Sequence, residues 1–240
     1  MEFDDEGIPV DPESGSVISL NKGRLNSYRE ARERAMEEII SAVKEVRVDG
    51  EYLVVDLIKN NDDFQRKLYG VVSSKIRYHE YPVDFRTSGC KATLSISNIL
   101  AVLPYQYQSE DFPGRIDMPV STYYTSVIVD TRRIKAQPMV SPSIYNENGL
   151  EIYGRNYVDI NSAVRYGMVT YVNTVSEAMK HSRAGEHPYY TIALKKLNGC
   201  PVIADKDVKK IYGNDDTLME LRKCRVIFII RKDNEKSVQP

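Results

Sequence analysis

The spacing of apolar residues changes along this chain and divides it into predicted elements. From residue 28 to 46, apolar residues recur every three or four positions, which is the period of a helix with one buried face. Ser27 and Glu30 have the spacing of a capping box at its start, and Asp49-Gly50 supplies a turn after its end. The sequence therefore predicts one long amphipathic helix at about residues 28–46.

Beyond residue 50 the period shortens to two, which is typical of strands. The predicted strands are 51–58, 68–78, 90–99, 122–134, 150–153, 166–172, 189–194, 201–204 and 225–231. The last one, RVIFIIR, is a continuous apolar run and predicts a strand buried on both faces. Short helices are predicted at 175–181, capped by Asn173 or Thr174, and at 205–212, ended by Gly213. The predicted fold is α+β, a mainly antiparallel sheet or sandwich with one long helix and short peripheral helices.

The two ends of the chain differ from its middle in composition. Residues 1–20 carry six acidic and no basic side chains and are interrupted by proline and glycine, which predicts a flexible acidic arm. Residues 233–240 form a polar tail of the same kind. No charge-rich linker and no internal repeat divides the remainder, so residues 21–232 are predicted to form a single domain.

Overall charge and composition narrow the class of protein. The formal net charge is −1, from 33 basic and 34 acidic residues, which argues against a general nucleic-acid coat and leaves local basic patches open. No apolar run is long enough for a membrane span, and the first residues lack the pattern of a secretory signal, so we expect a cytoplasmic or virion location. The cysteines Cys90, Cys200 and Cys224 are expected to be free thiols rather than a disulfide framework.

Residues able to carry catalysis are sparse. The chain has no phosphate-binding glycine motif and no nucleophile motif, and His181 and His187 are expected in a surface loop, so no metal and no cofactor is predicted. Asp56 and Asp130 lie on two predicted strands and would meet if those strands were neighbours. Converging carboxylates are what a metal-dependent nuclease or other hydrolase needs, so these two are weak catalytic candidates. The balance favours a protein that is not an enzyme.

Basic residues concentrate in one short stretch, interleaved with tyrosines. They are Arg66, Lys67, Lys75, Arg77, Arg86 and Lys91. Such a face suits single-stranded nucleic acid, through phosphate contacts and base stacking, and it also suits the acidic arm of another copy. The alternative is the solvated outer face of a sheet.

Tyrosines gather with prolines in the middle third of the chain, and tyrosine is favoured at interfaces because it joins apolar area to a polar group. The interface candidates are Tyr105, Tyr107, Tyr123, Tyr124 and Tyr145. The first hypothesis is therefore a structural, self-assembling protein of viral-coat, matrix-like or virion-associated type, a homo-oligomer joined by the arm and the Tyr/Pro loops. The alternatives are a nucleic-acid-binding accessory protein using residues 66–91, and the hydrolase.

Overall fold

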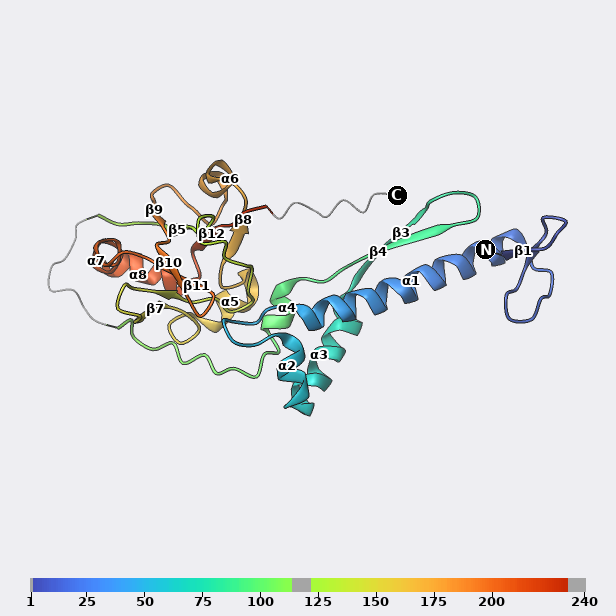
Figure 1. Cartoon of the computed structure of the whole chain (residues 1–240), viewed down its shortest axis with the longest axis horizontal. Helices are drawn as coiled ribbons and strands as arrows, with labels where there is room; N and C mark the ends of the chain where they lie inside the picture. The colour runs from blue at the N-terminus through green and yellow to red at the C-terminus, as the bar shows by residue number, and fades with distance from the viewer. Residues whose placement is uncertain (1, 114–121, 233–240) are drawn as a thin grey trace. The chain divides into compact units, whose positions relative to one another are not determined.

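The computed structural model describes residues 2–113 and 122–232, and contacts within the chain divide it into two compact units (Figure 1). Unit 1 contains residues 2–45 and 65–95, and unit 2 contains 46–64 and the described residues from 96 onward. This division describes contacts within the folded chain and not independent folding, so a single domain over 21–232 stays a prediction. The predicted tail at 233–240 lies outside the described residues.

Unit 1 is built on the long helix α1, Leu20–Glu45. The helix is confirmed and ends within a residue of its predicted end, but its start is wrong by eight residues. Ser19 begins it, because its Oγ accepts the Lys22 N–H at 3.2 Å, whereas Ser27 is buried inside the helix. Ser27 and Glu30 therefore have the spacing of a capping box without acting as one, because both lie inside α1.

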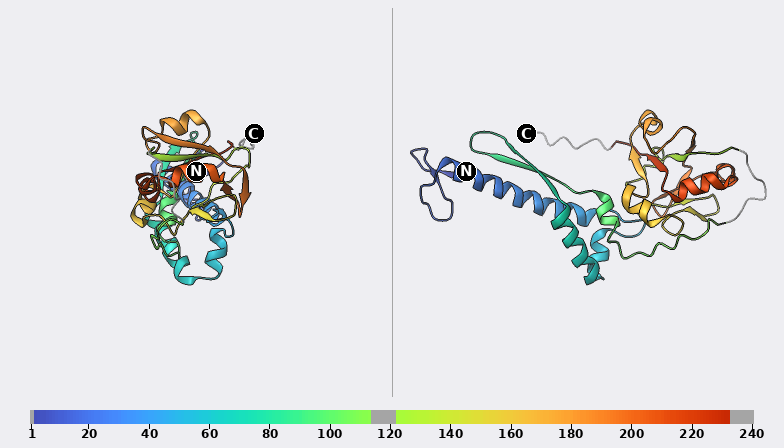
Figure 2. Two further views of the ribbon diagram at one scale, coloured as in Figure 1. Left: turned by 90° about the vertical axis from the view of Figure 1, so that its left-hand side faces the viewer. Right: turned by 180° about the vertical axis from the view of Figure 1, so that it is seen from behind.

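A two-stranded antiparallel hairpin, β3 (Arg77–Pro82) and β4 (Ser88–Thr93), packs along α1 (Figures 1 and 2). Buried residues of α1 are mostly small, as in Gly23, Ser27 and Ala35, and small side chains let neighbouring strands lie close to the helix. The Arg32 guanidinium covers the Tyr78 ring, 4.2 Å from its centroid. Since an isolated hairpin is marginally stable in water, this packing is what holds β3 and β4 in place.

The acidic arm contacts its own unit. Strands β1 (Glu2–Phe3) and β2 (Pro9–Val10) pair antiparallel, and Asp4 closes the turn between them by accepting the N–H groups of Glu6 and Ile8. Phe3 stacks on Phe85 at the tip of the β3–β4 hairpin, with ring centroids 6.0 Å apart. The arm therefore has local structure and a docking place in the same chain, and its flexibility in solution stays a prediction.

Two predicted strands prove to be helices. Residues 51–58 contain α2 (Val54–Lys59), and residues 68–78 fall mostly in α3 (Asp62–Lys75). Asp56 favours α2 because its carboxylate accepts the Leu53 N–H at 3.0 Å, at the helix start. In α3 the buried side chains are Phe64, Leu68 and Val72. Their spacing of four puts them on one face of a helix as readily as on one face of a strand. The predicted strand 90–99 is likewise shorter, because it gives way to helix α4 (Ile96–Leu100).

Unit 2 is centred on a parallel sheet with strand order β8-β12-β5-β9. Its strands are β5 (Ser126–Asp130), β8 (Thr170–Val172), β9 (Pro188–Ile192) and β12 (Val226–Ile229). The α+β class is confirmed, whereas a mainly antiparallel sheet or sandwich is wrong. Every residue of β5 and β12 is buried, as predicted for β12, and burial on both faces is the usual condition of parallel strands.

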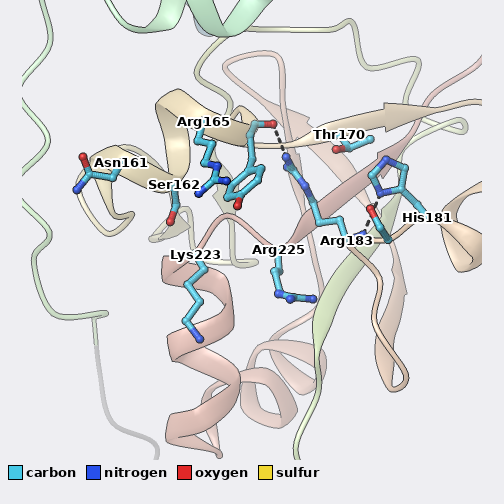
Figure 3. Close-up of a pocket in the computed structure, with 10 residues that line it drawn as sticks. Asn161, Ser162, Arg165, Thr170, His181, Arg183, Lys223 and Arg225 are labelled. Carbon is cyan, nitrogen blue, oxygen red and sulfur yellow. Dashed lines mark hydrogen bonds between the residues drawn. The ribbon is translucent and has the colours of Figure 1, made fainter.

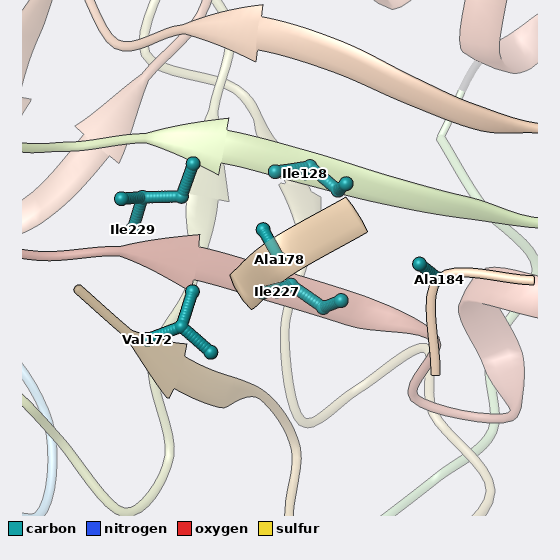
Figure 4. Packing of buried hydrophobic residues seen from close by; sticks show 6 residues of the cluster. All are labelled: Ile128, Val172, Ala178, Ala184, Ile227 and Ile229. Atoms are coloured by element: carbon teal, nitrogen blue, oxygen red, sulfur yellow. The ribbon is translucent and has the colours of Figure 1, made fainter. Parts of the chain in front are cut away.

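Helix α6 (Val175–Lys180) covers one face of this sheet (Figure 4). The cluster beneath it is fully or almost fully buried and consists of Ile128, Val172, Ala178, Ala184, Ile227 and Ile229. Ala178 is the buried residue of α6, and Val175 also packs against the cluster; the small side chain of Ala178 lets the helix lie close to the isoleucines. Thr174 caps α6, its Oγ1 accepting the Glu177 N–H at 3.1 Å, so the predicted helix and its cap are confirmed.

The remaining elements of unit 2 surround the parallel sheet. A second sheet has the order β10-β11-β6-β7, from Lys195–Leu197, Cys200–Val202, Ile144–Tyr145 and Glu151–Tyr153. Helix α7 (Asp205–Tyr212) ends at Gly213 as predicted, while α5 (Ile160–Tyr166) and α8 (Asp215–Arg222) were not predicted. None of the helices in residues 2–113 and 122–232 combines the length and apolarity that crossing a bilayer requires.

Candidate functional site

The two catalytic candidates each serve a local structural purpose. Asp56 lies on helix α2, where it accepts the Leu53 N–H and lies 3.9 Å from the Lys59 ammonium. Asp130 ends strand β5. The premise that both residues lie on neighbouring strands is therefore wrong, because Asp56 is on a helix. In the described parts of the chain, no group of three or more His, Cys, Asp or Glu side chains is placed to hold a metal ion.

Asp130 is the centre of a small polar cluster at the carboxyl end of the parallel sheet. Its carboxylate accepts two hydrogen bonds from the Arg132 side chain, at 2.9 and 2.6 Å, and one from the Tyr190 hydroxyl at 2.8 Å. The bonds from Arg132 are the main reason that the pKa of Asp130 lies below its usual value. A carboxylate held in its charged form by a guanidinium is a stable ion pair and a poor general base.

The basic candidates all lie in unit 1, on two different elements. Arg66, Lys67 and Lys75 are on α3, Arg77 and Lys91 are on the hairpin strands, and Arg86 is at the hairpin tip. Arg86 covers the Phe3 ring at 4.9 Å, and Arg66 and Lys67 interact with other groups of the chain. The set is therefore divided between a helix and a hairpin, and its role in binding nucleic acid or an arm stays a prediction.

One face of the β3–β4 hairpin does combine exposed cations with aromatic rings. Arg77 and Lys91 are exposed there, and His79 stacks on Tyr81 with ring centroids 6.2 Å apart. The Tyr81 ring lies over Gly89, where a Cβ would be 2.5 Å from the ring. Neither Arg77 nor Lys91 forms an ion pair with a described carboxylate.

The interface candidates are partly buried within the chain, with one exception. They are Tyr105, Tyr107, Tyr123, Tyr124 and Tyr145. Tyr105 donates to Asp49 at 2.6 Å, Tyr124 packs edge-on against Tyr189 at 4.8 Å, and burial raises the pKa of Tyr107 to about 12. Tyr123 is the exposed member of the set, at 39%. The five therefore do not form an outward belt.

Tyr105 and Tyr145 line a polar pocket of about 210 Å³ in unit 2. Arg155 covers the Tyr105 ring at 4.1 Å and lies 3.9 Å from the Asp49 carboxylate. Burial raises the pKa of Glu151 in the same pocket, where one carboxylate oxygen accepts from Ser143 at 3.0 Å and the other is buried with no protein partner. The sequence pattern does not indicate that Glu151 is buried, because it appears there only as a polar residue at the start of a predicted strand.

Unit 1 also presents exposed apolar side chains at the N-terminal end of α1. The most exposed are Leu25 at 69%, Val17 at 67%, Val83 at 60% and Phe85 at 58%. Among the large hydrophobic residues described in either unit, these four have the highest exposure. The arm and the β3–β4 tip meet near the N-terminal end of α1 through the Phe3–Phe85 stack (Figures 1 and 2). We call the four exposed side chains on these three elements the apolar end.

A second surface feature is a basic pocket of about 750 Å³ in unit 2 (Figure 3). Its charged lining consists of Arg165, Arg183, Lys223 and Arg225, joined by His181. These residues come from α5, from the loop after α6, and from the segment between α8 and β12, so the fold brings them together from distant parts of the sequence. No Asp or Glu is among the described residues that line the pocket.

Comparison with known proteins bears on unit 2 alone. Residues 126–233 are similar to a family described as the second domain of Treponema pallidum Tp0624. The matched segment begins at the first strand of the parallel sheet and includes the whole of that sheet, although it is less than half of the 240 residues. No curated protein matches the chain. The similarity therefore covers the part of unit 2 that carries the parallel sheet and the basic pocket.

Proposed function

We propose that this protein is a structural component that self-associates through unit 1. The observation that carries the proposal is the apolar end, where Val17, Leu25, Val83 and Phe85 are more than half exposed. Apolar side chains gathered in one region of a surface mark interaction sites, because their burial in a complex removes them from water. The narrower expectations, a viral coat or virion-associated protein in the cytoplasm or a virion, stay predictions.

A second copy of the chain is the partner that the charges favour. Glu2, Asp5, Glu6 and Glu13 of the arm are exposed, and none forms an ion pair with a described residue. The same unit also has exposed cations that form no ion pair with a described residue: Lys75, Arg77 and Lys91. One unit thus carries both halves of a complementary pair, and complementary charge orients and accelerates association.

The hairpin offers a geometry for that contact. β3 and β4 pair only with each other among the described strands, so the outer edge of each has unpaired backbone groups. Unpaired strand edges accept a strand from another chain. An arm docking on the hairpin of the next copy is a head-to-tail contact, and such contacts generate rings or filaments.

The test is sedimentation velocity of the full chain over a wide concentration range, at low and high salt. Wild type is expected to form species larger than a monomer, and salt is expected to weaken them. The double variant Val83→Ser/Phe85→Ser is expected to stay monomeric. The matched control is Leu150→Ser/Leu194→Ser, which removes two side chains of unit 2 that are 48% and 55% exposed. A monomer at every concentration, or equal loss in both double variants, would refute the proposal.

A second candidate function, binding of single-stranded nucleic acid, is favoured by the Arg77, His79, Tyr81 and Lys91 face. Unpaired cations beside an exposed aromatic ring are the groups that bind phosphates and stack on bases. Fluorescence anisotropy with a labelled oligonucleotide tests it: affinity should fall with salt and fall further in Arg77→Ala/Lys91→Ala. The control variant is Lys195→Ala/Lys196→Ala, on the exposed strand β10. Identical affinity of the two variants would remove this candidate.

A further inference from the structure

The basic pocket concentrates positive charge that the surrounding protein leaves largely uncompensated. Among the carboxylates of the described residues, Glu220 is the one that forms ion pairs with these cations, with Lys223 at 2.8 Å and with Arg225 at 2.6 Å. Four cations against this single carboxylate leave a net charge of +3. Arg165 is exposed and forms no ion pair with a described carboxylate; its guanidinium lies 5.2 Å from the Tyr166 ring centroid.

Arg183 is fixed in position without a negative partner. Its guanidinium donates to the backbone carbonyls of Gly167 at 3.3 Å, Val226 at 3.4 Å and Tyr166. Carbonyl oxygens satisfy hydrogen-bond donors but do not neutralise a charge, and arginine stays protonated in proteins. Burial lowers the pKa of Arg183, which reports the cost of removing this cation from water. An anion beside it would offset that cost.

We propose that the basic pocket binds a phosphorylated small molecule. Guanidinium groups present paired N–H donors that match the oxygens of a phosphate, and a net charge of +3 suits a ligand with two or more negative charges. The hydroxyl of Thr170, which lines the same space, adds a neutral donor. This site is independent of the assembly contact proposed for unit 1, since every lining residue belongs to unit 2.

The size and arrangement of the pocket decide the kind of phosphate. About 750 Å³ is the volume of a pocket for a whole small molecule and is much more than a bare phosphate fills. The cations surround one cavity from three segments of the chain, whereas binding a nucleic-acid backbone calls for cations that follow a path. We therefore infer a ligand with an organic part, such as a sugar phosphate or a nucleotide.

Isothermal titration calorimetry of the full chain tests the site with three probes: inorganic phosphate, ribose 5-phosphate and adenosine 5′-monophosphate. At least one organic phosphate is expected to bind more tightly than inorganic phosphate. Arg165→Ala is expected to weaken that binding about tenfold or more, since the variant removes one charged donor from the ligand. Because Arg165 is exposed and bonds no carboxylate of the described residues, the variant should keep the fold, which circular dichroism checks.

Lys209→Ala is the matched control, because Lys209 is an exposed cation of unit 2 on helix α7, outside the pocket. It is expected to leave binding unchanged. Two results would overturn the proposal. One is that none of the three probes binds at millimolar concentration. The other is that Lys209→Ala and Arg165→Ala weaken binding equally, since the charge of the whole protein would then explain it.

Discussion

The central strand β12 should be far more sensitive to loss of side-chain volume than the edge strand β9. Ile227 on β12 is fully buried beneath α6, whereas Ile192 on β9 is 43% exposed. Both are isoleucines in the same parallel sheet, so replacing each by alanine removes the same three carbon atoms. The difference between the two variants therefore measures burial alone.

The expected magnitudes follow from exposure. Three buried carbons contribute roughly 2.4 kcal/mol of transfer free energy at about 0.8 kcal/mol each. At Ile227 a cavity adds to this, so Ile227→Ala should cost about 2–5 kcal/mol. At Ile192 a little over half of the side chain is removed from water and no closed cavity remains, so the cost should be about 1.4 kcal/mol.

Urea unfolding followed by tyrosine fluorescence measures both values. Thirteen of the 17 tyrosines lie in unit 2, so this signal reports mainly the unit that contains the parallel sheet. Equal destabilisation by Ile227→Ala and Ile192→Ala would show that β12 is not the buried centre of the sheet. A loss below about 1 kcal/mol at Ile227 would show the same.

Four further predictions concern unit 2. Asp130 has a lowered pKa, so its ion pair should stabilise the fold above about pH 4 and lose that effect as pH falls through the lower folded-state pKa. The urea midpoint of Asp130→Asn should therefore lie below that of wild type at pH 7 and match it near pH 2. Glu151 has a raised pKa and should show the opposite sign, so Glu151→Gln should gain stability over wild type as pH rises from 4 to 8 in the same assay. Asn214→Ala removes the acceptor of the Thr217 N–H at the start of α8 and should cost about 0.5–2 kcal/mol by thermal melting, with an unchanged melting temperature contradicting the cap. Gly185→Ala should destabilise the protein more than Gly7→Ala. Both glycines have positive φ, but only at Gly185 would the new Cβ meet a neighbour, the Thr125 Oγ1 at 2.6 Å. Equal melting temperatures of the two variants would exclude that clash.

Helices that begin or end at a recognisable capping residue were predictable from the sequence. Thr174 at the start of α6 and Gly213 at the end of α7 identify both helices within a residue, because a cap is a contact between near neighbours in the chain. The buried run at 225–231 is likewise confirmed as a strand, since continuous apolar character reports burial on both faces.

The failures have two physical causes. Leu68 and Val72 are four residues apart, a spacing shared by one face of a helix and one face of a strand, so their period does not separate α3 from a strand. Parallel pairing depends on which distant segments meet, which local pattern does not encode. The basic pocket could not be predicted for the same reason, because its arginines are far apart in the sequence and come together only in the folded chain: Arg165, Arg183 and Arg225.

The position of β12 in the sheet has a consequence for the order of folding. It is the last of the four strands to leave the ribosome, yet it lies between β8 and β5, and β8 has no other neighbour in the sheet. Val226 pairs with Val127, about a hundred residues earlier, so the decisive contact closes a long loop. Until it forms, the backbone groups of β5 and β8 that pair with β12 have no partner, and unpaired strand edges of this kind favour aggregation of an incompletely folded chain.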